Sequence, residues 1–251
     1  MKLDLAGAIA SIPVCHWTTP VSAAAAPDEP TFSITLGSTA DPQALPLTLQ
    51  ILALLTLLAL APALVIMVTS FTRILIVLSF TRSALGTQQI PPNMVLVGLA
   101  LFLTVFTMAP VWRTVNEQAL QPYLRHEIGY QMASTRAIAP LRDFMLRQTD
   151  EPDLALFVKL GKLARPKKPD DIPTYVIIPA FMVGELKRAF TMGFMIFLPF
   201  VVIDMVVATI LMSMGMMMMP PVVISLPCKI LLFVLVNGWT LVTESVVTSF
   251  R

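Results

Sequence analysis

A run of methionines is the first feature of the sequence that could do chemistry. Nine of the 16 methionines lie between residues 192 and 219, and four are consecutive: Met216, Met217, Met218 and Met219. Methionine is unbranched and soft, so it fills gaps in a core or re-packs around a variable partner. Four consecutive residues cover every face of a helix or loop, so some must face a partner, lipid or a lumen. Thioethers also suit Cu(I), although no histidine or cysteine accompanies this run.

Two charged residues, Asp204 and Lys229, interrupt otherwise apolar stretches. Each costs about 2.5–3.5 kcal/mol to place in lipid, so we expect both to face protein or water. Asp204 lies 16 residues before Pro220, and Lys229 lies 8 residues after Pro221. If the proline pair is the tip of a straight hairpin, their depths differ by about 12 Å. We therefore predict no direct salt bridge within the hairpin. Each side chain would instead meet a neighbouring helix or subunit, or act in a proton relay.

A further group of charges, Glu185, Lys187 and Arg188, stands at the entrance of the third long apolar segment. Charges at such a boundary can anchor a helix at a membrane surface. The acid among them, Glu185, can also pair with Lys229 across an interface. We predict that Glu185, like Asp204 and Lys229, is a buried or intersubunit charge.

The composition excludes several classes of protein. Of 251 residues, 56% are hydrophobic and 13% are charged, against about 25% charged in soluble domains. The net charge of +2 and the lack of a basic patch argue against nucleic-acid binding. Cys15 and Cys228 form no CxxC motif, and His16 and His126 stand far apart. No phosphate-binding loop, zinc-protease or serine-hydrolase signature occurs. We predict a protein that is not an enzyme and holds no metal or other cofactor.

Four hydrophobic segments predict an all-α, membrane-associated fold of bent helical hairpins. Residues 47–69 carry no charge and, as a helix, would be about 34 Å long, enough to cross the hydrocarbon layer. The others are residues 94–112, 189–219 and 222–250. We divide the chain into a first hydrophobic hairpin (47–112), a polar extracytoplasmic region (113–188) and a second hydrophobic hairpin with a Met-rich loop (189–251).

The polar region is mostly helical by its pattern. It holds 12 of the 17 basic and 9 of the 15 acidic residues. Apolar residues recur at helical spacing in 140–148 and 153–163. Thr149 or Asp150 can cap the second of these helices, with Pro152 in its first turn.

The N-terminus and the charge distribution indicate an orientation. Residues 1–26 resemble a signal peptide, with Lys2, a moderately apolar stretch and an Ala-rich cleavage site near Ala25; the alternative is a disordered Ala/Pro-rich tail. Residues 27–46 form a Pro-rich linker. The loop at 70–93 carries Arg73 and Arg82 and no acid, which favours the cytoplasmic side. The polar region would then lie outside.

Four long stretches resemble the FliP family, the flagellar type III export-gate subunits, and cover roughly residues 64–250. They are SFTRILIVLSFTRSALGTQQIPPNMVLVGLALFLTVFTMAP, PLRDFMLRQTDEPDLALF, ELKRAFTMGFMIFLPFVVIDMVVATILMSMGMMMMPP and LPCKILLFVLVNGW. Homologous subunits of the virulence injectisome share much of the pattern. The leader, the linker and SALGT look more like the flagellar branch.

The resemblance implies an assembly and a site. Five copies would join two smaller export-gate membrane subunits in the bacterial inner (cytoplasmic) membrane, within the flagellar basal body and among its other proteins. Unfolded export substrates would pass through the pore. The family's methionine gasket maps onto Met216, Met217 and Met218, and Met219 extends it. Its transmembrane acid and lysine map onto Asp204 and Lys229.

Together these signals predict a pore-forming structural subunit of a protein-conducting channel. A ring of such loops would be apolar and dewetted when closed, which raises a barrier to ions. The flexible methionines would deform around any passing chain. The alternative function is a stand-alone carrier of ions or small solutes that uses Asp204 as its coupling acid.

Overall fold

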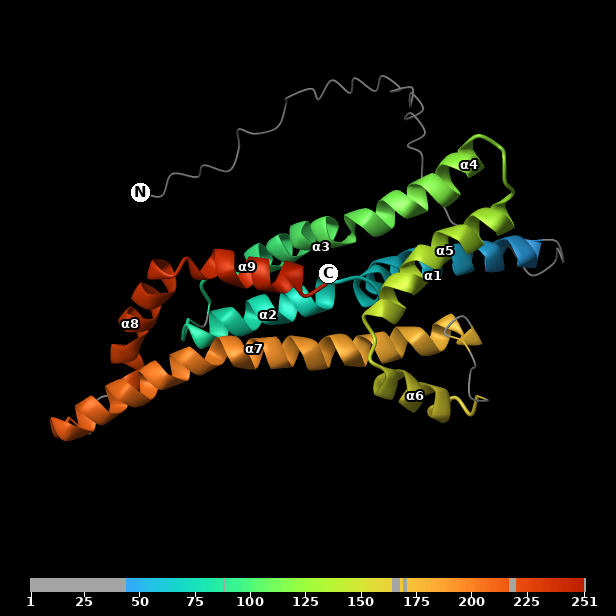
Figure 1. Ribbon diagram of the computed structural model, residues 1–251. Helices are drawn as coiled ribbons and strands as arrows, with labels where there is room; N and C mark the ends of the chain where they lie inside the picture. Colours follow the sequence, from blue (N-terminus) through green and yellow to red (C-terminus); the bar gives the residue numbers. More distant parts are fainter. Residues whose placement is uncertain (1–43, 88, 164–167, 169–170, 217–219, 251) are drawn as a thin grey trace, which may run out of the picture. The chain divides into compact units, whose positions relative to one another are not determined.

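The computed structural model describes residues 44–87, 89–163, 168, 171–216 and 220–250. The predicted signal peptide, most of the predicted linker and the residues Met217, Met218 and Met219 therefore lie outside the described residues. The chain divides into two compact units, residues 1–53 and residues 54–251. Helix α1 (Ala44–Val68) crosses this boundary, and all later helices belong to the second unit (Figure 1).

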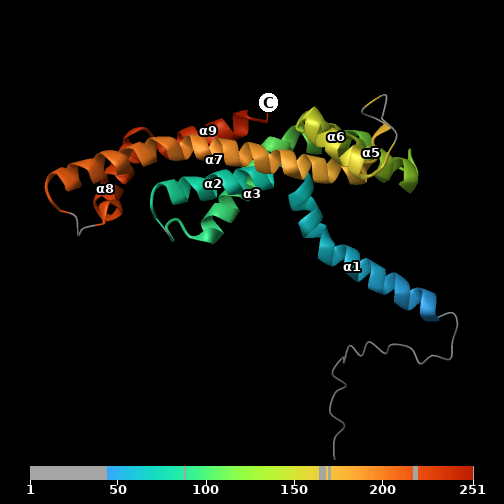
Figure 2. The same cartoon turned by 90° about the horizontal axis from the view of Figure 1, so that it is seen from below.

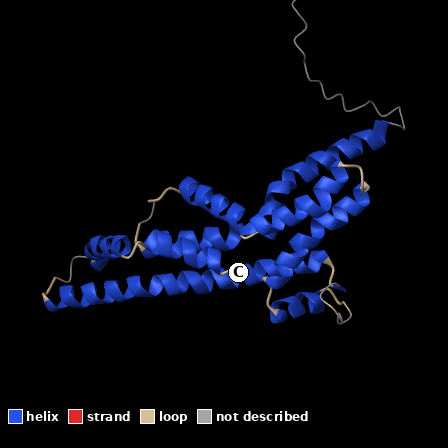
Figure 3. Cartoon of the chain, turned by 45° about the horizontal axis from the view of Figure 1, so that its top comes forward, coloured by secondary structure: helices blue, strands red, loops and turns tan. Residues whose placement is uncertain are grey.

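Every regular element of the described residues is a helix (Figure 3), which confirms the predicted all-α, membrane-associated fold. After α1 come α2 (Phe71–Ala84), α3 (Asn93–Val115), a π-helical turn (Asn116–Leu120), α4 (Gln121–Leu124), α5 (Tyr130–Arg147), α6 (Glu151–Leu160), α7 (Thr174–Ser213), α8 (Pro221–Leu235) and α9 (Gly238–Thr248).

Three stretches of the described residues are long and apolar enough to cross a membrane: 51–68, 93–124 and 174–213. A fourth is counted if α8 and α9 form one span, although the two helices are bent by 64° at their junction. The junction falls at Asn237, whose backbone is left-handed (φ 52°). The bend in the fourth hydrophobic segment therefore comes from a left-handed residue at a helix end, with no proline at the junction.

The segment predicted as a loop at 70–93 contains helix α2, and this part of the prediction is wrong. Figure 2 shows α2 beside α7, and it also contacts α3 and α9. Its apolar residues recur at helical spacing and are fully buried at Ile74, Val77 and Leu78. Arg73 was counted as a loop charge that favours the cytoplasmic side, yet its side chain is 1% exposed. The orientation inferred from this segment stays a prediction.

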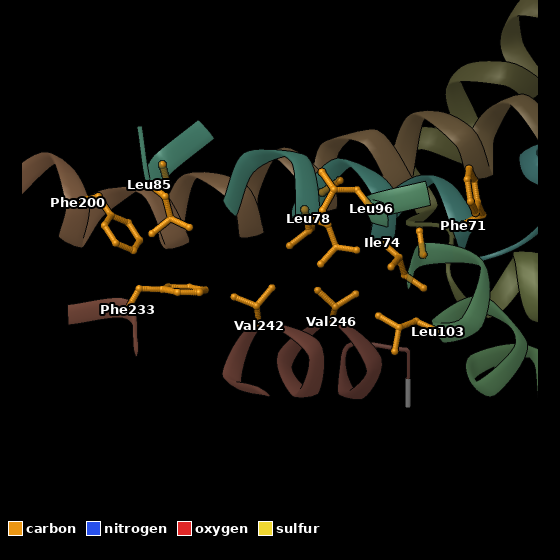
Figure 4. Close-up of a cluster of buried hydrophobic side chains, with 14 residues drawn as sticks. Phe71, Ile74, Leu78, Leu85, Leu96, Leu103, Phe200, Phe233, Val242 and Val246 are labelled. Carbon is orange, nitrogen blue, oxygen red and sulfur yellow. The ribbon is translucent and has the colours of Figure 1, made fainter. Parts of the chain in front are cut away.

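The main core forms where α2, α3, α7 and α9 meet. In Figure 4, Val242 and Val246 of α9 point toward Ile74 and Leu78 of α2. Helices α2 and α7 also approach closely at Gly193, where an added Cβ would lie 2.6 Å from the Phe80 ring. A small residue at this crossing lets the two backbones come together, as in many membrane helix pairs.

Helix α7 begins at Thr174, whereas the sequence placed the start of the third apolar segment at residue 189. Its first turns build a second core with α5 and α6, in which Ile177 and Phe181 are fully buried. The polar residues near 185–188 therefore lie inside a continuous helix. The helical pattern predicted for the polar region is confirmed by α5 and α6, with Asp150 at the N-cap of α6 and Pro152 in its first turn.

Candidate functional site

The end of α7 sets the entrance to the methionine loop. Gly215 has a positive φ of 76°. Its N–H donates to Met212 O at 3.1 Å, and the Met216 N–H donates to Leu211 O at 3.0 Å. These two bonds form a Schellman motif, which closes a helix through a left-handed glycine. Met216 is thus held directly beyond the last turn and is partly exposed, and Met217–Met219 lie outside the described residues.

A direct salt bridge joins the two helices that flank this loop. Lys229 Nζ on α8 lies 2.6 Å from Asp204 Oδ2 on α7, and Ser225 Oγ donates to Asp204 Oδ1 at 2.5 Å. The prediction that Asp204 and Lys229 do not pair within the hairpin is therefore wrong. The Lys229 side chain is 5% exposed and that of Asp204 is 32% exposed.

The error came from the position assumed for the hairpin tip. The tip was placed at Pro220, but α7 already ends at Ser213 and α8 begins at Pro221. Counted from these helix ends, Asp204 and Lys229 lie at nearly equal depth. The signal that could have located the end of α7 was Gly215, because glycine is the usual residue one position past a helix C-cap.

A second ionic cluster surrounds Arg73 of α2. Its guanidinium binds the Glu185 carboxylate of α7 through both Nε, at 2.9 Å, and Nη2. Nη1 donates to Ser249 O at 3.2 Å and Ser249 Oγ at 3.0 Å, and Nη2 also donates to Gln148 Oε1 at 3.1 Å. All five N–H donors of the arginine therefore have acceptors.

This arginine cluster is buried and connects distant parts of the chain. Arg73 is 1% exposed and Glu185 is 0% exposed. The Arg73 Cζ atom also lies 3.8 Å from the centre of the Phe250 ring, a cation–π contact. Burial lowers the pKa of Arg73, and its bonds to Glu185 oppose that shift. An arginine remains charged at any physiological pH, so the cluster behaves as a fixed ionic joint.

A more exposed layer covers the arginine cluster. Arg188 donates to Gln148 Oε1 at 3.0 Å and to Asp150 Oδ1 at 2.6 Å. Lys187 Nζ lies 3.8 Å from Asp150 Oδ2. The hydrogen bond from Arg188 is the main cause of a lowered pKa at Asp150. Within the chain, Glu185 and its neighbours thus meet Arg73, Gln148 and Asp150.

Sequence reasoning missed Arg73 and Gln148 as members of this cluster. Arg73 had a signal of its own, since a lone arginine in an apolar helical stretch needs an acid nearby. Gln148 had none, because a glutamine at a helix end is usually solvated. Among the described residues, no three His, Cys, Asp or Glu side chains lie close enough to hold a metal ion.

Comparison with known proteins gives one consistent result. Residues 54–246 match the FliP family. The chain is 52% identical over 217 residues to the "Flagellar biosynthetic protein FliP" of Bacillus subtilis (strain 168), covering 86% of this chain and 98% of that protein. It is also 52% identical to proteins of the same name from Pectobacterium carotovorum, covering 81% and 79%, and from Caulobacter vibrioides, covering 80% and 76%.

Proposed function

Because the chain belongs to the FliP family, we propose that it is a pore-forming, non-enzymatic subunit of the flagellar type III protein export gate. Copies of it, five in the assembly that we propose, join two smaller membrane subunits in the flagellar basal body. Unfolded flagellar proteins cross the bacterial inner membrane through the resulting pore. The observation that carries this proposal is the methionine run between two helices that a partly buried salt bridge holds together.

The α7–α8 hairpin is suited to present flexible side chains at a constriction. The Schellman motif fixes where the loop leaves α7, and Pro220 precedes the first turn of α8. The Asp204–Lys229 bridge holds the two helices together eight or nine residues away from the loop. The ends of the loop are thus fixed while its methionines keep three rotatable bonds each. Such a loop can seal against ions and still yield to a polypeptide.

The apolar surface supports an assembly. Large hydrophobic side chains remain exposed on α3, α7 and α8, including Phe102, Phe106, Phe194, Met205 and Leu235. A water-soluble monomer rarely shows contiguous apolar patches of this kind. Lipid and neighbouring subunits are the partners that such a surface fits.

The test is ion leak through the assembled gate. Changing Met216, Met217 and Met218 together to Ala should widen the closed constriction and raise the leak of small ions in cells. Met205→Ala, a methionine on the exposed face of α7, is the matched control and should leave the leak unchanged. A triple variant that assembles normally and does not leak would contradict the gasket.

The alternative function, a stand-alone carrier, is favoured by one observation. Asp204 is about one-third exposed, so its carboxylate has access to a bound ion as well as to Lys229. A carrier would purify as a monomer or dimer and bind a solute. The mass of the assembly purified in detergent separates the two functions, because the gate subunit should appear near five copies with its partner subunits.

A further inference from the structure

A cavity of about 600 Å³ lies where α3, the end of α5 and α9 meet. This volume falls in the range typical of small-molecule sites. Its walls are mainly apolar and include Phe106 and Pro110 from α3 and Val247 from α9, with Phe250 just beyond that helix. The salt bridges and the methionine loop described above do not line it.

One charged side chain, Arg147, lines this cavity. Arg147 is the last residue of α5, and its side chain forms no ion pair with any described residue. Asp150, three residues after Arg147, pairs with Arg188, and neither Asp150 nor Asp143 or Glu244 lines the cavity. The cavity therefore combines apolar walls with an uncompensated positive charge, and the ligand that complements it has an apolar body and an anionic head.

The place of the cavity in α3 points to the surface of a membrane. Pro110 lies two residues before Trp112 and three before Arg113, where the long apolar run of α3 ends. Tryptophan and arginine mark the boundary between the hydrocarbon and the head groups. On the apolar side, Phe102 and Phe106 follow each other by one helical turn and are 71% and 74% exposed. An acyl chain can lie along these rings with its head group beside Arg147.

The inner wall of the cavity is already ordered. Gln148 is buried, and its side chain accepts from Arg73 and Arg188 and donates to Phe250 O at 3.3 Å. Phe250 is in turn held against Arg73. A ligand that enters the cavity meets a fixed wall and loses less free energy to ordering the site.

We propose that this cavity binds an anionic phospholipid, with its phosphate at Arg147 and one acyl chain along Phe106 and Phe102. Arginine suits this role because its planar guanidinium binds phosphate oxygens in pairs. A second copy of the chain would need an acidic side chain at this position to give the same complementarity. Arg147 also stabilises the C-terminus of its own helix through the helix dipole, but that role gives no preference among lipid head groups.

The experiment uses the full chain in its detergent-purified assembly, titrated with phosphatidylglycerol or phosphatidylcholine of the same acyl chains and followed by native mass spectrometry. The wild type should bind phosphatidylglycerol more tightly, by about fivefold for one arginine at the membrane surface. Arg147→Gln should abolish this preference and leave the oligomer intact. Arg136→Gln, an exposed arginine earlier on α5 that does not line the cavity, should keep it.

A second variant tests the cavity itself. Val247→Trp should fill it and weaken the binding of both lipids. The proposal is overturned if the wild type shows no head-group preference or if Arg147→Gln retains it. It is also overturned if a photoreactive amino acid at position 107 crosslinks to a second copy of the chain and captures no lipid.

Discussion

Each of the two ionic clusters of this protein pairs a buried cation with an acid, but the two surroundings differ. Arg73 is buried with Glu185, and all of its donors have acceptors from α7, the end of α5 and the residues after α9. Lys229 is buried too, but its acid Asp204 is about one-third exposed and the cluster joins only α7 and α8. The first arrangement is a joint shielded from water, and the second is a two-helix contact that solvent reaches on its acidic side.

The difference also separates two parts of α7. Its first half lies in a core with α5 and α6, whereas its last turns carry exposed methionines and end at Ser213, two residues before Gly215. In the proposed pore, the arginine cluster would hold the frame, the bridge would hold α7 beside α8, and the methionines of the loop would adjust to substrates. The effects of variants that break the two clusters should therefore differ in size and in kind.

The largest effect is expected for Glu185→Ala. This change leaves the Arg73 guanidinium buried without its anion, which costs about 3–5 kcal/mol. We expect loss of the folded chain, measured as accumulation in membranes and as thermal unfolding in detergent. Lys187→Ala, an exposed cation two residues later, is the control and should change stability by less than about 0.5 kcal/mol. Equal stability of the two variants would show that the arginine cluster is not a structural joint.

A smaller loss of stability is expected at the hairpin, and its size should depend on which partner of the salt bridge is replaced. Asp204→Asn leaves the buried ammonium of Lys229 without its anion and should cost about 2 kcal/mol. Lys229→Met leaves an acid that is partly solvated and should cost less. Thermal unfolding of both variants in detergent shows which of the two loses more stability. If Lys229→Met were the more harmful change, the partial exposure of Asp204 could not be what distinguishes this cluster.

Gln148 tests how the arginine cluster is linked to its exposed layer. Gln148→Ala removes the acceptor shared by Arg73 and Arg188. We expect a loss of about 1–2 kcal/mol, because the cluster keeps its acid and loses one neutral partner. Gln131→Ala, on the exposed face of α5, provides the control for the same substitution. A loss as large as that of Glu185→Ala would mean that Gln148, and not the acid, holds the cluster together.

The smallest effect on stability is expected when a fall in pH protonates Asp150. Arg188 holds the pKa of Asp150 below its ordinary value. The pair therefore adds stability above the pKa of an unfolded aspartate, about 3.9, and this is lost as pH falls through the lower folded pKa. Because Asp150 is 38% exposed, the loss should stay below about 1 kcal/mol. The unfolding midpoints of wild type and Asp150→Asn should converge in acid, and a constant gap would contradict the assignment.

The fold class could be predicted from the sequence because it follows from local patterns. Hydropathy predicted helices of spanning length, and the spacing of apolar residues in 140–148 and 153–163 predicted α5 and α6. Helix α2 was missed because Arg73 and Arg82 were counted as the charges of a loop on the cytoplasmic side. A buried ion pair neutralises such a charge, and the partner, Glu185, stands 112 residues away in the chain.

The salt bridge at the hairpin shows that predicting a site can depend on where a single helix is predicted to end. The distance between Asp204 and Lys229 follows from where α7 ends, and that end is set by Gly215. Placing the turn at the prolines shifted one helix by about two turns and separated two residues that pair. The role proposed for Met216 involves other copies of the chain, and a single sequence holds no geometric information about them.

The proposed pore is tested most directly by crosslinking at Met216. In a chain whose Cys15 and Cys228 are replaced by Ser, Met216→Cys should form disulfides between copies in native membranes and give dimers on a denaturing gel. A bifunctional thiol reagent of short span should give the same dimers, because each copy carries a single thiol and one crosslink consumes it. Met205→Cys, on the exposed face of α7, should not form these dimers. If Met216→Cys stayed monomeric while lipid-soluble reagents labelled it freely, the loop would face the bilayer and the gasket would be wrong.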